Sequence, residues 1–320
     1  MTTYGFHASH EQISPRQLLA DVVLAEEVGF GAAMCSDHVA PWSERQGHSG
    51  MAWPWLGAAL ASTNLSFGTV TAPGQRYHPV VVAHAIATLG QMFPGRFWTA
   101  LGSGENANEH VTGDAWPRKE VRQARLEECV SVIRRLLQGE TVSHDGLVTV
   151  HEARVWERAE PTPKLIAPAV SVETAVRGAA WADGLATINQ DPAVLREMLA
   201  RWDDAGGADH KVLQVHVSWA PTADEAYAIA YDQWRSNVFA PPACWDLTVP
   251  GFDAVSREGI SREQVERAVV VASDLGELTA RIHDLAALGF DAVYLHHVGQ
   301  EQKPWLEAAG ASVLPQLKGD

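Results

Sequence analysis

The strongest constraint on the fold is one local pattern that occurs near both ends of the chain. Residues 27–34 read Glu-Val-Gly-Phe-Gly-Ala-Ala-Met, and residues 286–295 read Ala-Ala-Leu-Gly-Phe-Asp-Ala-Val-Tyr-Leu. Each is typical of a helix that ends at a glycine and leads through a buried phenylalanine into a strand. The same unit at both ends predicts a single wound α/β domain over residues 1–320.

Between these ends, short apolar runs alternate with amphipathic stretches. Strands are predicted near residues 5–8, 34, 65–71, 97–101, 164–167, 184–188, 213–219 and 294. Helices are predicted near residues 14–29, 79–92, 118–138, 172–181, 193–204, 223–237, 275–288 and 301–317. This pattern predicts a (β/α)8 TIM barrel, in which the catalytic residues follow the C-terminal ends of the strands.

A doubly wound open sheet is the competing architecture. Its first strand-to-helix turn is normally rich in glycine, whereas Gly5 is followed by Phe-His-Ala-Ser, so the dinucleotide-binding pattern is absent from that turn. Residues 240–266 are rich in Pro, Trp and Gly and are predicted to form an insertion before the last barrel unit.

Charge and composition narrow the classes of partner. The chain carries 24 basic and 39 acidic residues, a net charge of −15, which argues against binding to nucleic acid or to an anionic membrane surface. The N-terminus does not resemble a signal peptide and no apolar run is long enough to span a membrane, so a cytoplasmic location is expected. Cys35, Cys129 and Cys244 lack metal-type spacing and are expected to be free thiols.

Polar side chains gather where the second predicted strand ends. Residues 34–42 read Met-Cys-Ser-Asp-His-Val-Ala-Pro-Trp. Asp37 and His38 therefore adjoin the strand, Pro41 prevents a regular continuation, and Trp42 follows. In a barrel this position indicates a catalytic role, and an ordinary loop with a surface histidine is the alternative.

Two other strand ends offer candidates on the same rim. They are His7, Ser9, His10 and Glu11 after the first strand, and Glu105, Asn108, Glu109 and His110 after the fourth. A histidine and a glutamate from opposed loops can act as a base and an acid. Glu105 could instead be an acid that stabilises a helix N-terminus. Gly102 and Gly104 allow a flat ligand to approach the backbone closely.

Five short blocks carry a resemblance to a known family. They are Gly-Phe-His-Ala-Ser-His-Glu-Gln (5–12), Ser-Asp-His-x-x-Pro-Trp (36–42) with Gly-His after it (47–48), Arg-Tyr-x-Pro (76–79), Gly-x-Gly-Glu-x-x-Asn-Glu (102–109) and Val-Ala-Ser-Asp (271–274). Over nearly its whole length the chain resembles the luciferase-like flavin-dependent oxidoreductases, and within them the deazaflavin-dependent glucose-6-phosphate dehydrogenase group. The resemblance implies a barrel with an insertion, a bound coenzyme F420 (a deazaflavin) or FMN, a small-molecule substrate and a homodimer.

The resemblance also implies roles for individual residues. His38 is expected to take the substrate hydroxyl proton while hydride leaves for the cofactor. Glu105 is expected to be the acid that serves the reduced ring, Trp42 to steady the transition state, and Glu11 to share their cavity. Cofactor-binding positions are expected at Asp37, Thr69, Val70, Thr71, Gly104, Asn108, Val170 and Ser171. Residues 69–71 are expected to contain a non-prolyl cis peptide, and Val170-Ser171 replaces a glycine pair used near the cofactor phosphate.

The chain departs from that group at the substrate site. Members that accept sugar phosphates hold the phosphate with a threonine, two lysines and an arginine, because a dianion needs charge-assisted partners. Here Ile188 and Asp191 stand where a threonine and a lysine are expected, and Ala268 stands where the arginine is expected. Four aromatic residues are expected to line this site instead: Trp219, Trp234, Phe239 and Trp245. A small neutral alcohol or carbonyl substrate is therefore predicted, and not glucose 6-phosphate.

Three other functions stay open. An FMN-dependent monooxygenase would use the same fold. A metal-dependent barrel hydrolase could use His7, His10, His38 and the His296-His297 pair, although the His-Ala-Ser-His step does not put both side chains on one strand face. A flavin-binding protein without activity is the third. A flavin absorbance band would distinguish an oxidoreductase from a hydrolase, and turnover would distinguish it from a carrier.

Overall fold

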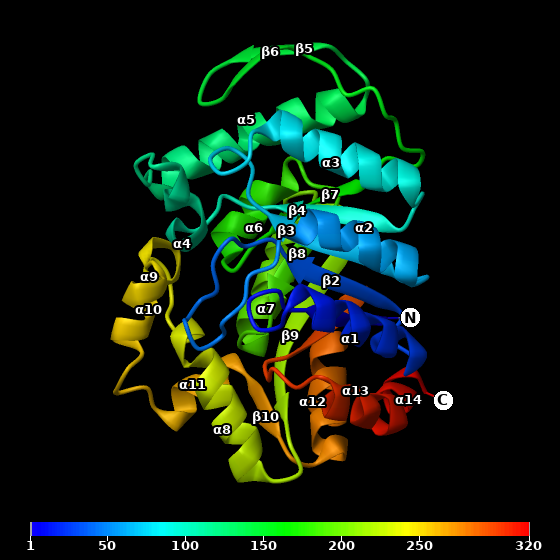
Figure 1. Cartoon of the computed structure of the whole chain (residues 1–320), viewed down its shortest axis with the longest axis vertical. Coiled ribbons are helices and arrows are strands. Elements are labelled where there is room, and N and C mark those ends of the chain that lie inside the picture. Colours follow the sequence, from blue (N-terminus) through cyan, green and yellow to red (C-terminus); the bar gives the residue numbers. More distant parts are fainter. Residues whose placement is uncertain (1, 320) are drawn as a thin grey trace.

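The computed structural model describes residues 2–319. Within this range, eight parallel strands close into a barrel, and each strand is hydrogen-bonded to two neighbours (Figure 1). They are β1 (Thr3–Ala8), β2 (Ala32–Ser36), β3 (Ser66–Thr71), β4 (Phe97–Leu101), β7 (Lys164–Pro168), β8 (Leu185–Ile188), β9 (Lys211–Trp219) and β11 (Ala292–His297). β11 closes the ring by pairing with both β1 and β9. The predicted TIM barrel is confirmed.

Large side chains fill the barrel interior above small residues of the neighbouring strands. A Cβ atom on Gly68 would lie 1.9 Å from the Trp98 ring, and one on Gly5 would lie 2.4 Å from the Tyr294 ring. Trp98 and Tyr294 pack edge to face with their centroids 6.1 Å apart. The two rings belong to a buried interior cluster, so the barrel is a packed core and not a channel.

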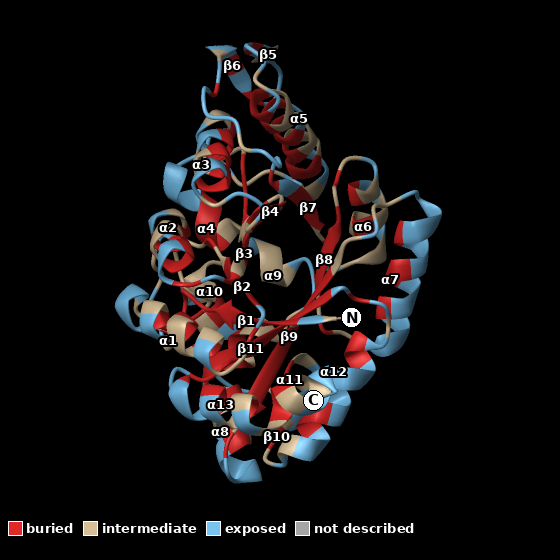
Figure 2. Cartoon of the chain, turned by 90° about the vertical axis from the view of Figure 1, so that its right-hand side faces the viewer, coloured by how far each residue is buried: buried red, intermediate tan, exposed pale blue. Residues whose placement is uncertain are grey.

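Helices surround the barrel and each buries one face against it (Figure 2). They are α1 (Pro15–Glu27), α2 (Ala52–Ser62), α3 (Pro79–Met92), α5 (Lys119–Leu137), α6 (Val172–Ala179), α7 (Pro192–Asp204), α8 (Ala223–Trp234), α12 (Leu275–Ala286), α13 (Lys303–Ala308) and α14 (Leu314–Lys318). Side-chain caps define several of the starts, as at Ser14 and Asp274, which accept hydrogen bonds from N–H groups of the first turn.

Some elements were not predicted from the sequence. α2 is almost uniformly apolar, so no amphipathic period marks it. β5 (Val142–Asp145) and β6 (Thr149–Ala153) form a short, largely polar antiparallel hairpin that lies over α5 (Figure 1). β10 (Val270–Ala272) adds only three residues beside β9. The single helix expected at 301–317 is α13 and α14 joined by a π-helical turn at Ala309–Val313.

Residues 240–268 carry short helices between α8 and β10. They are α9 (Ala243–Asp246), α10 (Val249–Val255) and α11 (Arg262–Ala268). These helices lie along one side of the barrel, beside α8 and the four-residue helix α4 (Asn106–Glu109) (Figure 1). The segment therefore packs against loops that follow the strand C-termini.

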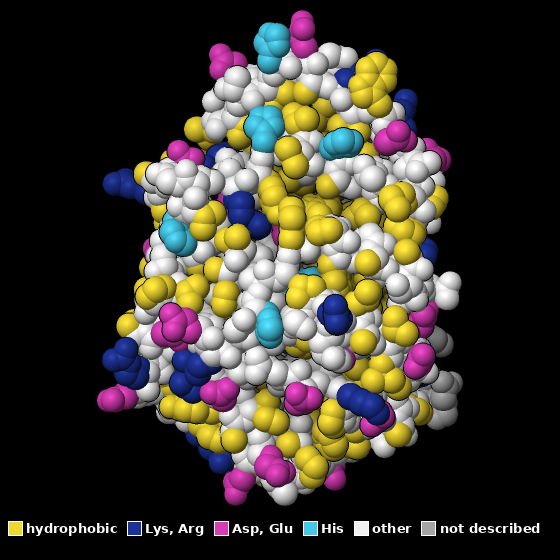
Figure 3. Space-filling view, in the orientation of Figure 1, with side chains coloured by type: hydrophobic (Ala, Val, Ile, Leu, Met, Phe, Trp, Pro, Cys, Tyr) yellow, Lys and Arg dark blue, Asp and Glu magenta, His cyan; other side chains and the backbone are white. Residues whose placement is uncertain are grey.

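The surface has no single dominant charge on the face drawn in Figure 3, where Lys and Arg side chains are interspersed with Asp and Glu. Hydrophobic side chains gather in the upper middle of that face. Within residues 2–319, none of the helices combines the length and the apolar character needed to cross a membrane.

Candidate active site

A cavity of about 830 Å³ opens where the barrel strands end. That is where barrel enzymes carry their active sites, and the volume is typical of a site for a cofactor and a small substrate. The predicted site residues that line it are Glu11, Asp37, His38, Trp42, Val70, Thr71, Gly104, Glu105, Asn108 and Val170. Met34, Ala186 and Val212 of the interior cluster also line the cavity and give it an apolar floor.

An imidazole and a buried carboxylate are paired in this cavity. Nδ1 of His38, in the loop after β2, lies 2.6 Å from Oε1 of Glu11, in the loop after β1. Ser9 donates its hydroxyl proton to Oε2 of the same carboxylate at 2.8 Å. The side chains of His38 and Glu11 are only 12% and 4% exposed, so water screens their attraction weakly.

The pairing controls the protonation of both groups. Burial by itself lowers the pKa of His38, but the nearby carboxylates of Glu11 and, less strongly, Glu105 outweigh burial and raise that pKa above its usual 6.5. Burial likewise opposes ionisation of Glu11, yet the His38 imidazole outweighs it and lowers the pKa of Glu11 to about 2. The carboxylate also favours the Nδ1–H tautomer, which leaves Nε2 of His38 as the proton-accepting nitrogen.

Trp42 and Glu105 line the same cavity as this pair. The Trp42 ring meets the His38 imidazole edge to face, with centroids 5.1 Å apart and planes at 86°. Glu105 directly precedes α4 and makes no side-chain capping hydrogen bond. Its carboxylate therefore lines the cavity without acting as a cap for the helix N-terminus.

Asp37 offers the cavity an unused acceptor. Its Oδ2 accepts the Thr71 hydroxyl proton at 2.9 Å and lies 3.5 Å from Nη2 of Arg76. Its Oδ1 is buried and has no protein partner among the described residues. A buried acceptor is costly unless a donor reaches it, so Oδ1 fits a ligand N–H such as that of a flavin or deazaflavin pyrimidine ring.

Asn108 and Gly104 shape the loops around the cavity. Oδ1 of Asn108 accepts hydrogen bonds from the N–H groups of Val39 at 2.9 Å and Ala40 at 3.2 Å, so it holds the loop that carries His38. Gly104 has φ +80°, and a Cβ there would lie 2.8 Å from the Glu109 side chain. Only glycine fits this position without strain.

Two of the expected cofactor-binding residues, Thr69 and Ser171, do not line the cavity. The Thr69 side chain points to the face of β3 opposite Val70, where its Oγ1 accepts a bond from Sγ of Cys35 at 3.5 Å. Ser171 does not line the cavity either; its hydroxyl caps α6 by accepting the N–H of Thr174 at 3.3 Å.

The expected non-prolyl cis peptide at residues 69–71 is also not found. The cis peptides of residues 2–319 are Glu160–Pro161 and Pro241–Pro242. Residues 66–71 instead pair in regular parallel register with β2 and β4.

Aromatic side chains form the wall on the side of residues 240–268. They are Trp42, Trp234, Phe239, Trp245 and Phe252. Trp219, expected in this wall, lies outside it: its indole N–H donates to the Ser273 carbonyl at 3.2 Å and its ring packs against the main core. The end of β9 turns this side chain away from the barrel mouth.

A buried polar network that lines the cavity was not predicted. Gln214 donates to Nε2 of His216 at 3.1 Å and to Nδ1 of His296 at 3.2 Å, and His296 reaches Oε1 of Gln12 at 2.8 Å. An amide nitrogen only donates, so these contacts keep both imidazoles neutral. Burial lowers the pKa of His216 to about 3. The available signal was the pair of polar residues at alternate positions of an otherwise apolar strand.

The histidines that a metal-dependent hydrolase would need are packed against rings. His7 stacks on His296 with centroids 4.3 Å apart, and His10 meets Trp55 edge to face at 4.8 Å. Among residues 2–319, no group of three His, Cys, Asp or Glu side chains is arranged to hold a metal ion.

Comparison with known proteins points to one family. The model of the luciferase-like monooxygenase family matches residues 1–292. A protein from Microbacterium testaceum (strain StLB037), named F420-dependent glucose-6-phosphate dehydrogenase, is 34% identical over 98% of this chain and 97% of its own length. The solved structure of an F420-dependent secondary alcohol dehydrogenase, in complex with an F420-acetone adduct, is similar with a TM-score of 0.91 and 26% identity over 99% of both chains. The coenzyme F420-dependent tetrahydromethanopterin reductase from Methanopyrus kandleri has the same fold, with a TM-score of 0.77 and 18% identity over 99% of both chains.

Proposed function

The chain belongs to the luciferase-like monooxygenase family, and from this premise we propose that it is an oxidoreductase that transfers hydride between coenzyme F420 and a small neutral alcohol or carbonyl compound. FMN is the alternative cofactor. The observation that carries the proposal is the His38–Glu11 pair in the cavity at the barrel mouth. Residues 1–320 then form one catalytic domain with residues 240–266 as its insertion.

In this proposal His38 is the base. An alcohol becomes a carbonyl compound when its C–H electron pair leaves as hydride and its O–H electron pair forms the new C=O bond. Nε2 of His38 takes the hydroxyl proton, and the Glu11 carboxylate stabilises the imidazolium that forms. The bound deazaflavin or flavin supplies the hydride acceptor. Trp42 lies against the imidazole and Glu105 is assigned as the acid beside the cofactor ring.

The cofactor assignment rests on donors and acceptors that a flavin or a deazaflavin can use. Oδ1 of Asp37 is the acceptor for a ring N–H, and Val70, Thr71 and Gly104 are assigned to contacts with the ring. Asn108 positions the loop of the base. F420 is preferred over FMN because the M. testaceum relative and the secondary alcohol dehydrogenase are both named for F420.

The phosphate group common to both cofactors is assigned to the loop after β7. Val170 lines the cavity and Ser171 caps α6. The first N–H groups of a helix are free to bind an anion. This assignment gives Ser171 an indirect role, since its own hydroxyl holds the helix start.

The buried cations of the cavity argue for a neutral substrate. Arg76 donates to the Asp37 carbonyl at 2.6 Å and lies 3.6 Å from Glu109. Arg122 is buried, donates to the Pro117 carbonyl at 2.7 Å and stacks over the Trp116 ring. Both guanidinium groups already contact the protein, and a phosphate would have to compete with these contacts, although Nε of each arginine is buried without a hydrogen-bond partner among the described residues.

The other cations that line the cavity lie nearer its edge. Lys119 is 3.5 Å from Glu173, and Arg267 is 2.8 Å from Glu263 with 71% of its side chain exposed. Water screens the exposed charge of Arg267, so it binds an anion weakly. The Lys119 side chain is only 30% exposed, and its ammonium lies over the Trp245 ring, 5.1 Å from the ring centroid.

The positions that would hold a sugar phosphate face the cavity here. Ile188, Asp191 and Ala268 all line it, and Asn189 donates to the Ala268 carbonyl at 3.1 Å, so the loop after β8 and the end of α11 are adjacent. A phosphate there would lose hydration beside a carboxylate, at a cost of several kcal/mol. A neutral apolar group would gain about 25 cal/mol per Å² buried.

Glucose 6-phosphate is the second candidate substrate, because the M. testaceum relative is named for it. The test begins with the absorbance spectrum of the purified protein and mass spectrometry of any released chromophore. The apoprotein is then loaded separately with F420 and FMN and assayed with neutral secondary alcohols, ketones and hexose 6-phosphates. The proposal predicts saturable turnover of a neutral compound with F420. Turnover of a sugar phosphate alone would contradict the substrate assignment, and turnover only with FMN would contradict the cofactor assignment.

A further inference from the structure

Phe252, on the insertion helix α10, is packed against the proposed catalytic residues. Its side chain is almost completely buried, and its ring meets the Trp42 ring edge to face with centroids 5.5 Å apart and planes at 84°. Trp42 in turn meets His38 at 5.1 Å. Three rings therefore form a continuous row from α10 to the proposed base.

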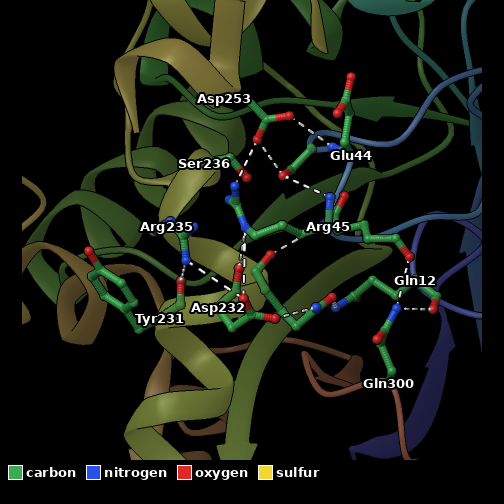
Figure 4. A network of polar contacts seen from close by, with 12 residues as sticks. Gln12, Glu44, Arg45, Tyr231, Asp232, Arg235, Ser236, Asp253 and Gln300 are labelled. Carbon is green, nitrogen blue, oxygen red and sulfur yellow. Dashed lines mark hydrogen bonds and ion pairs between the residues drawn. The ribbon is translucent and has the colours of Figure 1, made fainter. Parts of the chain in front are cut away.

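The next residue of α10, Asp253, is bonded to the segment that follows Trp42. Its Oδ1 accepts the Ser43 hydroxyl proton at 2.5 Å and a guanidinium proton of Arg45 at 2.8 Å. Its Oδ2 accepts the N–H of Glu44 at 2.9 Å (Figure 4). One carboxylate thus holds three consecutive residues that lie more than 200 positions away in the sequence.

Other contacts tie the same segment to α8, but none replaces Asp253. Arg45 donates to the Asp232 carbonyl at 3.0 Å. Gln46 accepts the N–H of Trp42 at 2.8 Å and donates to the Gln233 carbonyl at 3.1 Å. Without Asp253, the Ser43 hydroxyl and the Glu44 N–H would lose their acceptor, and Arg45 would keep only its contacts with α8.

α10 is too short to hold its own position against the segment after β2. It spans the seven residues Val249–Val255, and its N-cap Thr248 makes no side-chain capping bond. A helix of this length is not stable alone, so its position depends on tertiary contacts. The contacts of Asp253 and Phe252 with the segment after β2 supply them.

We propose that Asp253 is a positioning residue for the reaction: by holding residues 43–45 against α10, it keeps Trp42 between Phe252 and His38 and makes the insertion one wall of the substrate site. Asp253 does not line the cavity, so it acts through Trp42 and not on the substrate. The inference rests on the proposed function for its kinetic consequence, but the anchoring itself does not depend on turnover.

The test compares wild type with Asp253→Ala, Asp253→Asn and the control Glu258→Ala, which removes an exposed carboxylate of the same segment. Hydrogen–deuterium exchange of residues 42–46 and 249–256 reports the anchoring, and cofactor affinity and the kcat and KM values report the site. Asp253→Ala is expected to speed exchange in both segments and to lower kcat/KM about 10- to 100-fold, the scale of a misplaced catalytic group. Cofactor affinity is expected to change less than about twofold, since Asp253 lies outside the cavity.

Asp253→Asn keeps a side-chain acceptor of the same size and is expected to lie between wild type and Asp253→Ala. If the alanine variant does not fold, Asp253→Asn alone is compared with wild type. The control Glu258→Ala is expected to match wild type. Unchanged exchange, or faster exchange with unchanged kcat/KM, would overturn the proposal. If the wild type turns over no candidate substrate, the proposed function fails. The anchoring is still tested in that case: faster exchange in Asp253→Ala supports it, and unchanged exchange overturns it.

Discussion

Oε1 of Glu11 and Nδ1 of His38 lie 2.6 Å apart, although the two residues belong to loops that follow different strands. The contact joins the loops after β1 and β2 at the barrel mouth, and it determines which nitrogen of His38 can act. A proton accepted at Nε2 creates an imidazolium whose charge the carboxylate stabilises. The pair is therefore both a structural contact and the centre of the proposed chemistry.

The first prediction concerns Glu11→Gln. In wild type, burial lowers the pKa of His38, but the Glu11 carboxylate outweighs burial and the pKa is raised above 6.5. Alcohol oxidation needs neutral His38, so kcat/KM is expected to rise with pH through this raised pKa. Removing the carboxylate charge lowers the pKa of His38, so kcat/KM is expected to rise at lower pH in the variant. Its maximum value at high pH is expected to be smaller than that of wild type. Profiles of kcat/KM against pH for the two proteins measure the shift, and an upward or absent shift would refute the assignment.

The second prediction separates chemistry from folding at His38. Removal of a general base typically costs about 10²–10⁴ in rate, so His38→Ala is expected to lose turnover on this scale while binding cofactor nearly as well as wild type. Single-turnover rates and a cofactor titration check both parts. A histidine with a purely structural role would instead lower melting temperature and cofactor occupancy together, with turnover per bound cofactor preserved.

The sequence predicts the barrel well because its signals are local and repeated. Every barrel strand carries an apolar run, and α1 and α12 start at side-chain caps that are visible in the sequence. α2 and β10 were missed because one lacks a polar face and the other is three residues long. Such elements are stabilised by the assembled fold and have little local signal.

The site could be predicted in part for a similar reason. Polar residues after the strand ends of a barrel must gather at one rim, so the sequence alone places His38 and Glu105 in one cavity. The direction of a side chain within a strand was harder to predict. Thr69 and Val70 are adjacent, yet Val70 lines the cavity and Thr69 does not. The hydrogen bonds between Asp253 and residues 43–45 join distant parts of the chain, and no local sequence pattern indicates them.

The third prediction tests the cofactor role of Asp37. A hydrogen bond to a charged group contributes about 1.5–3 kcal/mol, so Asp37→Ala is expected to weaken F420 binding by at least about tenfold. Asp21→Ala is the matched control, since it removes a buried carboxylate of α1 that does not line the cavity. It is expected to weaken binding much less. Titrations followed by cofactor absorbance compare the variants, and equal affinities for Asp37→Ala and wild type would show that Oδ1 binds no ligand donor.

The fourth prediction concerns acid stability. Burial lowers the pKa of His7, His10 and His297 to about 4 and that of His216 to about 3. Below pH 6.5 the unfolded chain therefore binds more protons than the folded one, and the free energy of unfolding falls as pH drops from about 6.5 towards 4. Each group contributes up to about 1.4 kcal/mol per pH unit.

His38 acts in the opposite sense, because its raised pKa adds stability below pH 6.5 that is lost as pH rises through it. One such group cannot offset four. Urea denaturation at pH 7.5, 6.0 and 5.0 measures the fall, and His297→Gln, which removes one buried imidazole, should show a smaller fall than wild type. Constant stability from pH 7.5 to 5.0 would contradict these burial effects.

The last prediction tests the substrate assignment by restoring cations. Asp191 and Ala268 line the cavity, so Asp191→Lys combined with Ala268→Arg would place two positive charges where the wild type has a carboxylate and a methyl group. Charge-assisted hydrogen bonds are the strong ones, and kcat/KM for a hexose 6-phosphate is expected to rise at least about tenfold. Turnover of the neutral substrate is expected to fall, because the new charges must be desolvated beside it.

Asp191 also caps α7 by accepting the N–H of Ala193. The double variant is therefore expected to lose about 1 kcal/mol of stability, which denaturation measures. Glu197→Lys makes the charge change of Asp191→Lys alone, on the exposed face of α7, and should leave both activities unchanged. If the double variant gains nothing with the phosphate, the cavity wall at Asp191 and Ala268 does not select the substrate.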